Sequence, residues 1–168
     1  MAWVSPTSDT ANEWTDSGFA WDDDTLTTAT HSTPAGWGPY LELHHAELQC
    51  TKVQGWWGIV NTQVTTIEVD VYYSGAYNNI YSGAIVTGSF QEYEIGSEQA
   101  VTAMRVRFSA SKANRLAYVY EVDFWEVVSG PTPNAFNKIL YTEEPPTPNA
   151  WNQIKQEAGT GWRKILYV

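Results

Sequence analysis

The sequence predicts an all-β protein, a jelly-roll β-sandwich that carries an extended C-terminal arm. Three observations indicate this architecture. Thr, Val, Tyr and Trp are abundant, and these residue types favour the pleated, half-buried surface of a strand over a helix. Short segments of alternating polar and apolar residues recur between turns rich in Gly, Ser and Asn, which is typical of a sandwich or barrel. Residues 130–168 differ in composition and contain a direct repeat.

The clearest strand signals lie in the second half of the sandwich region. Residues 65–73, TTIEVDVYY, alternate with a period of two, so their apolar side chains share one face. Residues 102–111, TAMRVRFSAS, alternate in the same way and direct Arg105 and Arg107 away from the core. Residues 116–127, LAYVYEVDFWEV, are apolar on both faces, as expected of a central strand that is covered on each side.

Composition and charge disfavour several classes of function. The net charge of −10 argues against nucleic acid and anionic membranes as partners, because phosphates require clustered Lys and Arg. No apolar run approaches the roughly 18 residues of a membrane-spanning helix, and the N-terminus lacks the basic and apolar segments of a signal peptide. Cys50 is the single cysteine, so it is interpreted as a buried small hydrophobe and not as part of a disulfide.

Charge and repetition divide the chain after Ser129. Residues 1–129 hold five Lys and Arg against sixteen Asp and Glu, whereas residues 130–168 hold four against three. In the second part, PTPNAFNKILYTEE is followed fifteen residues later by PTPNAWNQIKQEAG, and GWRKILYV closes the chain as a half-copy. The prolines keep the intervening segments extended. We therefore predict a sandwich domain over 1–129 and a Pro-rich, repeated arm over 130–168.

The arm is predicted to serve docking or assembly. Each of its boxes is too short to bury its own aromatic ring, so the boxes must pack either on this domain or on a neighbouring subunit. Spaced apolar anchors suit strand addition at an exposed sheet edge, where backbone hydrogen bonds supply affinity and side-chain pockets set the register. The predicted anchors are Phe136, Ile139, Tyr141, Trp151, Ile154, Trp162, Ile165 and Tyr167.

The acidic segment AWDDDTLTTAT, residues 20–30, is the main candidate for a metal site. It resembles the signature A-x-D-G-D-x-x-T of discoidin-like, or galactose-binding-like, β-sandwich domains, which include coagulation-factor type C domains and many carbohydrate-binding modules. Asp22, Asp24 and Thr27 match this signature, whereas Asp23 stands where the family has Gly. In the family this loop commonly holds a structural calcium ion, with a Glu of the last strand as a further ligand.

The resemblance implies a structural Ca²⁺ site formed by Asp22, Asp24, Thr27 and Glu121. The chemistry of these donors agrees, because calcium prefers six to eight oxygens from carboxylates, carbonyls and hydroxyls. Clustered carboxylates without a cation repel one another and raise their own pKa values. The alternative is a solvated acidic turn, since Asp favours turns through its own side-chain hydrogen bonds.

Four aromatic residues are candidates for a glycan site, because sugar-binding modules stack pyranose rings on aromatic side chains in loops. They occur in the Gly- and Pro-rich segment STPAGWGPY and in the motif GWWG, and they are Trp37, Tyr40, Trp56 and Trp57. The alternative is a place in the core or in a subunit interface, since tryptophan contributes a large contact area to either.

An enzyme is not expected. Nothing singles out a pair of catalytic carboxylates, and no nucleophile elbow, P-loop or H-E-x-x-H motif occurs. His44 and His45 are adjacent, so on a strand they point to opposite faces and do not converge on one metal ion.

Two non-enzymatic functions remain. The first is a structural or assembly protein that joins itself or other structural subunits through its arm. The discoidin-like resemblance extends to modules of tailed-bacteriophage virions, so this interpretation implies a capsid decoration or tail component located in the virion. The alternative is a carbohydrate-binding adhesion module at an extracellular surface, which binds cell-surface glycans through loop tryptophans. The repeated arm favours the assembly function.

Overall fold

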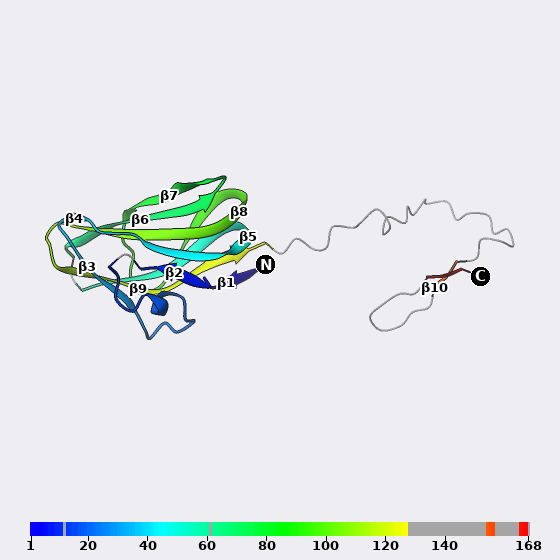
Figure 1. Cartoon of the computed structure of the whole chain (residues 1–168), viewed down its shortest axis with the longest axis horizontal. Helices are drawn as coiled ribbons and strands as arrows, with labels where there is room; N and C mark the ends of the chain where they lie inside the picture. Colours follow the sequence, from blue (N-terminus) through cyan, green and yellow to red (C-terminus); the bar gives the residue numbers. More distant parts are fainter. Residues whose placement is uncertain (12, 61, 128–153, 157–164, 168) are drawn as a thin grey trace. The chain divides into compact units, whose positions relative to one another are not determined.

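The computed structural model describes residues 1–11, 13–60, 62–127, 154–156 and 165–167. By its internal contacts the chain divides into two units, Met1–Ser129 and Gly130–Val168. The described part of the first unit is built from strands and one short 3-10 helix, so the all-β prediction is confirmed (Figure 1). Among the described residues, no helix is long and apolar enough to cross a membrane.

The strands of the first unit form one nine-stranded antiparallel sheet with the main order β1-β9-β5-β8-β6-β7. β2 adds to β5, β3 adds to β9 and β4 adds to β8. The elements are β1 (Ala2–Val4), β2 (Ser8–Thr10), η1 (Ser17–Ala20), β3 (Ala29–Thr33), β4 (Gly36–Trp37), β5 (Leu41–Ile59), β6 (Val64–Tyr73), β7 (Ala76–Ala84), β8 (Phe90–Ala110) and β9 (Arg115–Glu126).

Two long strands, β5 and β8, connect the two layers of the sandwich. They pair with each other along most of their length, β5 also pairs with β9, and β8 also pairs with β6. In Figure 1, β6 and β7 lie on one side of the domain and β1 and β9 on the other. The core between the layers includes Leu41, Leu43, Val53, Trp57, Ile67, Val69, Val71, Met104, Val106, Phe108, Val122 and Phe124.

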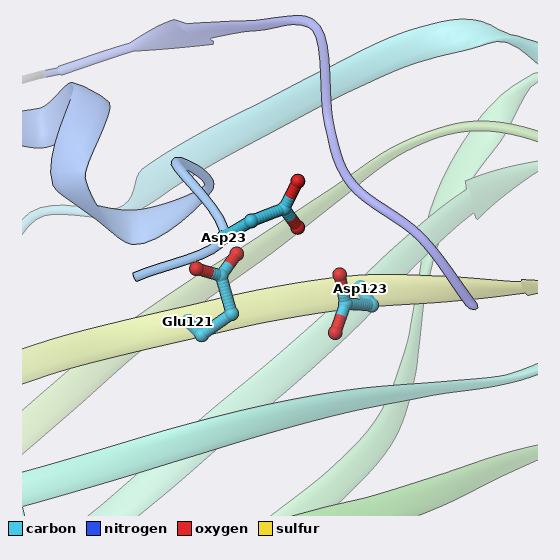
Figure 2. Close-up of side chains that lie close together, drawn as sticks. All are labelled: Asp23, Glu121 and Asp123. Atoms are coloured by element: carbon cyan, nitrogen blue, oxygen red, sulfur yellow. The ribbon is translucent and has the colours of Figure 1, made fainter. Parts of the chain in front are cut away.

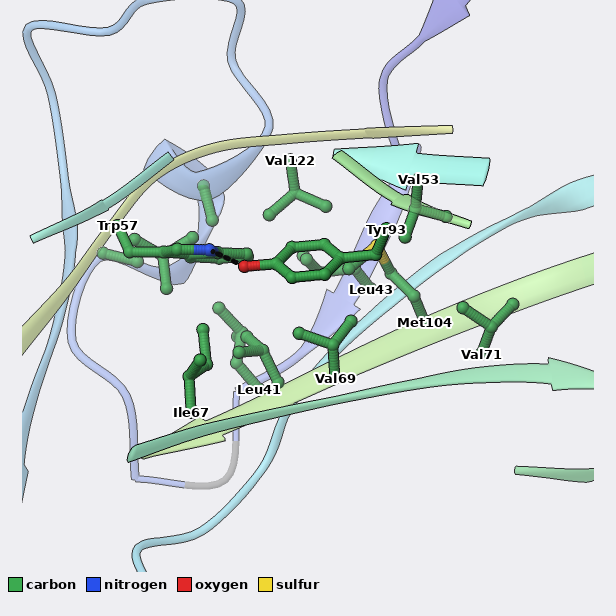
Figure 3. Close-up of a cluster of buried hydrophobic side chains, with 14 of the residues drawn as sticks. Leu41, Leu43, Val53, Trp57, Ile67, Val69, Val71, Tyr93, Met104 and Val122 are labelled. Atoms are coloured by element: carbon green, nitrogen blue, oxygen red, sulfur yellow. Dashed lines mark hydrogen bonds between the residues drawn. The ribbon is translucent and has the colours of Figure 1, made fainter. Parts of the chain in front are cut away.

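Trp57 is the largest fully buried side chain of the core. Its indole N–H donates a hydrogen bond to the Tyr93 hydroxyl at 2.8 Å, as Figure 3 shows, so the one polar atom of the ring is satisfied. Gly55, two residues earlier on the same face of β5, leaves the space that the ring needs. A Cβ atom at Gly55 would lie only 2.0 Å from Cη2 of Trp57.

The β6–β7 hairpin turns through Ser74 and Gly75. Both residues have positive φ, 53° and 82°. A two-residue turn with this backbone matches the right-handed twist of the flanking strands. The hairpin fixes the register of the outer strand, with Tyr73 opposite Ala76.

The second unit contains one described pair of short strands. β10 (Ile154–Gln156) and β11 (Ile165–Tyr167) are antiparallel, with Lys155 opposite Leu166. Three predicted anchors, Ile154, Ile165 and Tyr167, therefore lie on strands. The other predicted anchors lie outside the described residues, and they are Phe136, Ile139, Tyr141, Trp151 and Trp162.

Replacing Gly55 by Ala is expected to destabilise the fold. The new methyl group overlaps the Trp57 ring, and overpacking of this kind costs roughly 1–3 kcal/mol. Equilibrium unfolding in urea measures the loss. Gly18→Ala is the matched control, because nothing lies within 4 Å of a Cβ atom at Gly18. If Gly55→Ala and Gly18→Ala were equally stable, the Trp57 ring would not need the space that Gly55 leaves.

Candidate functional site

The acidic loop between η1 and β3 is held together by two of its three aspartates. The Asp22 carboxylate accepts hydrogen bonds from the Asp24 backbone N–H at 3.0 Å and from the Thr27 hydroxyl at 2.9 Å. The Asp24 carboxylate accepts the Leu26 N–H at 2.9 Å. These are turn-forming interactions of the kind that short polar side chains make with their own backbone.

The Asp23 side chain points away from the loop hydrogen bonds that Asp22 and Asp24 form, toward β9. Its φ of 61° is left-handed, which Asp tolerates better than most residues, and its carboxylate approaches Glu121 and Asp123 on β9 (Figure 2). One oxygen from each of these three residues lies within 4.8 Å of the others. Glu121 and Asp123 are buried, whereas Asp23 is exposed. We call these three residues the acidic cluster.

A β-bulge brings Glu121 into the acidic cluster. Trp56 of β5 is opposite Glu121, but the next residue, Trp57, is opposite Val119, so Tyr120 is an extra residue in β9. Strict alternation would place Glu121 on the core face together with Val119. The bulge reverses the alternation, and both Tyr120 and Glu121 come to lie on the outer face.

The acidic cluster has few hydrogen-bond donors. The Ser5 hydroxyl lies 2.6 Å from the Asp23 carboxylate and 3.1 Å from that of Asp123, and its single hydrogen serves one of them at a time. Gln54 donates its amide N–H to Asp123 at 2.7 Å. Among the described residues, no Lys, Arg or His forms an ion pair with the cluster.

Burial and mutual repulsion change the acidity of the cluster. Burial, followed by the charge of Asp123, raises the pKa of Glu121 from its usual 4.5 to about 7. Burial likewise raises the pKa of Asp123, against the stabilising hydrogen bonds from Gln54 and Ser5. Oε2 of Glu121 is buried and has no hydrogen-bond partner among the described residues.

The structure thus separates the predicted calcium ligands into two sets. Asp22, Asp24 and Thr27 interact within the loop. Glu121 lies with Asp23 and Asp123. Asp123 alternates with Glu121 along β9, a spacing that the sequence displays, but the side-chain direction of Asp23 depends on the folded loop.

Two of the predicted glycan-binding residues, Trp37 and Tyr40, belong to a stack of aromatic rings and guanidinium groups. The Trp37 ring lies 4.7 Å from the Arg107 guanidinium, and the Tyr40 ring lies 4.5 Å from the same group and 3.9 Å from that of Arg105. Tyr40 also donates its hydroxyl to Glu68. Tyr40 therefore offers little free ring surface, whereas Trp37 is 39% exposed.

The two tryptophans of GWWG lie on opposite faces of β5. Trp57 is fully buried in the core, so it has no surface on which a sugar ring can stack, and its predicted glycan role is wrong for this reason. Trp56 is half-buried on the outer face, and its ring lies 5.8 Å from that of Tyr120 and 5.5 Å from that of Phe90. Trp56 is therefore available for ligand contact.

Trp56 borders an open hollow of about 340 Å³. Its lining consists of Trp56, Gly58, Ile59, Thr87, Gly88, Tyr118 and Tyr120, and the chain at Trp57 also borders it although the Trp57 residue is fully buried. Gly58 allows the Tyr120 ring to lie close to β5, since a Cβ atom there would be 2.6 Å from Cε2 of Tyr120. We call this feature the aromatic hollow. Tyr118 and Tyr120 were not among the predicted glycan-binding residues, although their alternation with Ala117 and Val119, which are buried, indicated an outward direction.

Comparison with solved structures establishes the fold. A family 32 carbohydrate-binding module from a family 31 glycoside hydrolase of Clostridium perfringens matches with a TM-score of 0.57 at 12% identity, over 73% of this chain and 96% of that chain. The family 32 module of C. perfringens NanJ, solved with galactose, matches with a TM-score of 0.56 at 12% identity, over 71% and 93%. No protein-family model matches the sequence, and no curated protein matches it.

A third structure extends the comparison to another module. Chitosan-binding module 1 of a chitosanase/glucanase from Paenibacillus sp. IK-5 matches with a TM-score of 0.55 at 10% identity, over 73% of this chain and 96% of that chain. The fold of this protein is therefore that of the discoidin-like, galactose-binding-like β-sandwich domains. The sequence prediction of this fold is confirmed.

Thermal stability in the presence of a chelator is expected to fall between about pH 4.5 and pH 7. A carboxyl group with a raised pKa in the folded state contributes stability that is present below its unfolded pKa and is lost as the pH rises through its folded pKa. For Glu121 this window lies between 4.5 and about 7. Glu121→Gln should make the melting temperature less dependent on pH, as followed by circular dichroism.

Glu94→Gln on β8 is the matched control for this pH dependence, because Glu94 is an exposed glutamate outside the acidic cluster. It should retain the slope of the unmodified chain. The same slope in both variants would show that Glu121 does not set the pH dependence.

Proposed function

We propose that the sandwich domain is a non-catalytic carbohydrate-binding module whose ligand site is the aromatic hollow. The observation that carries this proposal is the group of half-buried aromatic rings, Trp56, Tyr118 and Tyr120, around an open concavity on the sheet. Ligand sites are typically concave and mostly apolar, with a few polar groups that fix orientation. The apolar face of a pyranose ring suits such rings.

The lining of the aromatic hollow indicates an uncharged ligand. It contains no Lys, Arg, Asp or Glu, and its polar side chains are the hydroxyls of Thr87 and the two tyrosines and the indole N–H of Trp56. Gly58 and Gly88 add backbone that a ligand can approach closely. These groups can bond sugar hydroxyls without selecting for charge.

The fold supports the same class of function. The solved structures with this fold include one module in complex with galactose, one bound to N-acetylgalactosamine and one described as chitosan-binding. A shared fold hosts many functions, so these names raise the prior for a glycan ligand and the aromatic hollow supplies the argument for this chain. The carbohydrate-binding alternative is therefore preferred over the assembly function that the sequence analysis favoured.

Trp56→Ala is expected to weaken glycan binding strongly, because it removes the largest ring from the aromatic hollow. A glycan array on the full chain identifies a ligand, and titration calorimetry then measures affinity. We expect at least a tenfold loss, about 1.4 kcal/mol. Tyr120→Ala should weaken binding as well.

Trp37→Ala is the matched control, since it removes a part-exposed tryptophan outside the aromatic hollow. It should leave affinity unchanged. Loss of binding in this variant, with Trp56→Ala unaffected, would move the glycan site to the aromatic–guanidinium stack. No binding to any array glycan would reject the proposed function.

A second function, assembly through the arm, is favoured by the repeat itself. Two of its boxes contribute the described strands β10 and β11, which pair with each other. We propose that the arm mediates self-association or attachment to other structural subunits, which would make a carbohydrate-binding domain multivalent. A location in a virion remains a prediction from the sequence.

The solution mass of the full chain, compared with that of a chain ending at Ser129, tests the assembly function. We expect an oligomer that becomes a monomer when residues 130–168 are removed, because the first unit has its own core. Circular dichroism verifies that the shortened chain remains folded. A monomeric full chain would reject self-association.

A further inference from the structure

A row of aromatic rings extends the aromatic hollow across three strands. The centre of the Trp56 ring on β5 lies 5.5 Å from that of Phe90 on β8 and 5.8 Å from that of Tyr120 on β9. The Tyr120 ring in turn lies 6.4 Å from the ring of Tyr118. We call these four rings the aromatic row. Because β8 and β9 flank β5, the aromatic row crosses two inter-strand spacings, about 9–10 Å. This span is longer than one pyranose ring.

The register of the strands places the aromatic row on one face of the sheet. Phe90 is directly opposite Trp56 in the β5–β8 pair, and Tyr118 is opposite Gly58 in the β5–β9 pair. Gly58 follows Trp56 by two residues, so both belong to the same face of β5. Opposite residues of neighbouring strands project to the same side, so the rings form one continuous surface. Gly58 adds no side chain to it and lines the hollow between Trp56 and Tyr118.

Exposed apolar side chains continue this surface beyond the aromatic hollow. Among the described residues, seven large apolar side chains are exposed, and three of them, Val60, Val86 and Leu116, border this place. Leu116 precedes Tyr118 by two residues on the same face of β9, and its carbonyl accepts the Val60 backbone N–H at 3.3 Å. Val86 is next to Thr87 of the lining. A gathering of exposed apolar groups marks an interaction site, and this one is larger than the hollow itself.

Hydroxyl groups accompany the apolar surface along its border with β3. Thr30 is opposite Tyr118, and Ser32 is opposite Leu116, so both hydroxyl side chains lie on the same face as the aromatic row. Thr87 contributes a further hydroxyl on the side of the β7–β8 connection. A hydroxyl both donates and accepts hydrogen bonds, as the hydroxyls of a sugar do. Apolar ring faces bordered by hydroxyls are also what an uncharged sugar chain presents.

We propose that the ligand of the aromatic hollow is an extended, uncharged oligosaccharide or polysaccharide chain, and not a single terminal sugar. The inference rests on the proposed carbohydrate-binding function and specifies its ligand. The chain lies obliquely across the strands, from Phe90 over Trp56 and Tyr120 and then along β9 to Leu116. The hollow is open, so a chain can continue past it in both directions, whereas a closed pocket would admit only a chain end. A β-1,4-linked chain suits this surface, because its equatorial linkages keep it extended and leave its apolar ring faces accessible.

The dependence of affinity on chain length tests this inference. Titration calorimetry of the full chain measures it with cello-, xylo-, manno- and N-acetylchito-oligosaccharides, from monomer to hexamer. We expect the hexamer of at least one series to bind at least about tenfold more tightly than its own dimer, because added residues contact further parts of the aromatic row. A hexamer that binds no more tightly than the dimer, or a failure of all four hexamers to bind, would overturn the inference.

Leu116→Ser tests the end of the path that lies outside the aromatic hollow. Leu116 is exposed, so the variant should fold, which circular dichroism verifies. Hexamer affinity should fall roughly fourfold or more, the equivalent of one methylene group that is no longer buried. Leu26→Ser is the matched control, because Leu26 is an exposed leucine in the acidic loop. It should leave hexamer affinity unchanged. Equal hexamer affinities of the two variants would contradict the proposed path.

Sedimentation of the full chain distinguishes a sugar chain from a protein partner on this surface. Leu116→Ser should leave the solution mass unchanged. A fall in mass would assign the surface to a subunit interface and overturn the inference. Failure of the inference is distinguishable from failure of the proposed function. Array glycans that bind only through a terminal sugar would retain the proposed function and reject the chain ligand, whereas no binding to any glycan would reject both.

Discussion

The acidic cluster depends on one irregularity, the β-bulge at Tyr120 in β9, which lies next to the aromatic hollow. Before the bulge, Ala117 and Val119 face the core, and after it Val122 and Phe124 do. The change of alternation places two consecutive residues on the outer face, where Tyr120 joins the aromatic hollow and Glu121 joins the acidic cluster. A regular strand would bury the Glu121 carboxylate among apolar side chains, at a high cost in desolvation. The bulge thus moves the Glu121 carboxyl group from the apolar core into the acidic cluster.

The distribution of the few cations explains why the acidic cluster stands alone. Arg105 and Arg107 project from β8 and pair with Asp70 and Glu68 of the neighbouring strand, and their guanidinium groups also contact the Tyr40 ring. On that face, charge is balanced by cross-strand pairs of the kind that stabilise sheets. On the outer face of β9, two buried acids and an exposed aspartate gather without such a pair. The two outer faces therefore differ in how their carboxylates are neutralised: arginines pair with them on one face, and no described cation pairs with them on the other.

The alternation of polar and apolar residues predicted which side chains are buried in the regular strands. It failed in β9, where a bulge interrupts the regular backbone. In β6 and β8, the predicted inward residues Ile67, Val69 and Met104 are fully buried. For β9 the sequence indicated a strand covered on both faces, but it gave no sign of the bulge that directs Glu121 outward. The direction of Asp23 was equally hidden, because it follows from hydrogen bonds that Asp22 and Asp24 form in the folded loop. The family signature drew attention to the acidic loop, and the folded backbone determines which of its carboxylates faces β9.

The motif GWWG shows how one short segment serves both the core and the surface. Gly55 gives the Trp57 ring its space inside, and Gly58 lets the Tyr120 ring approach the strand outside. Because neighbouring residues on a strand point to opposite faces, the two tryptophans have different roles despite their identical chemistry. Trp57 fixes the core beneath the strand, and Trp56 presents its ring above it. The packing that fixes Trp57 in the core therefore also fixes the segment of β5 that carries Trp56 at the edge of the aromatic hollow.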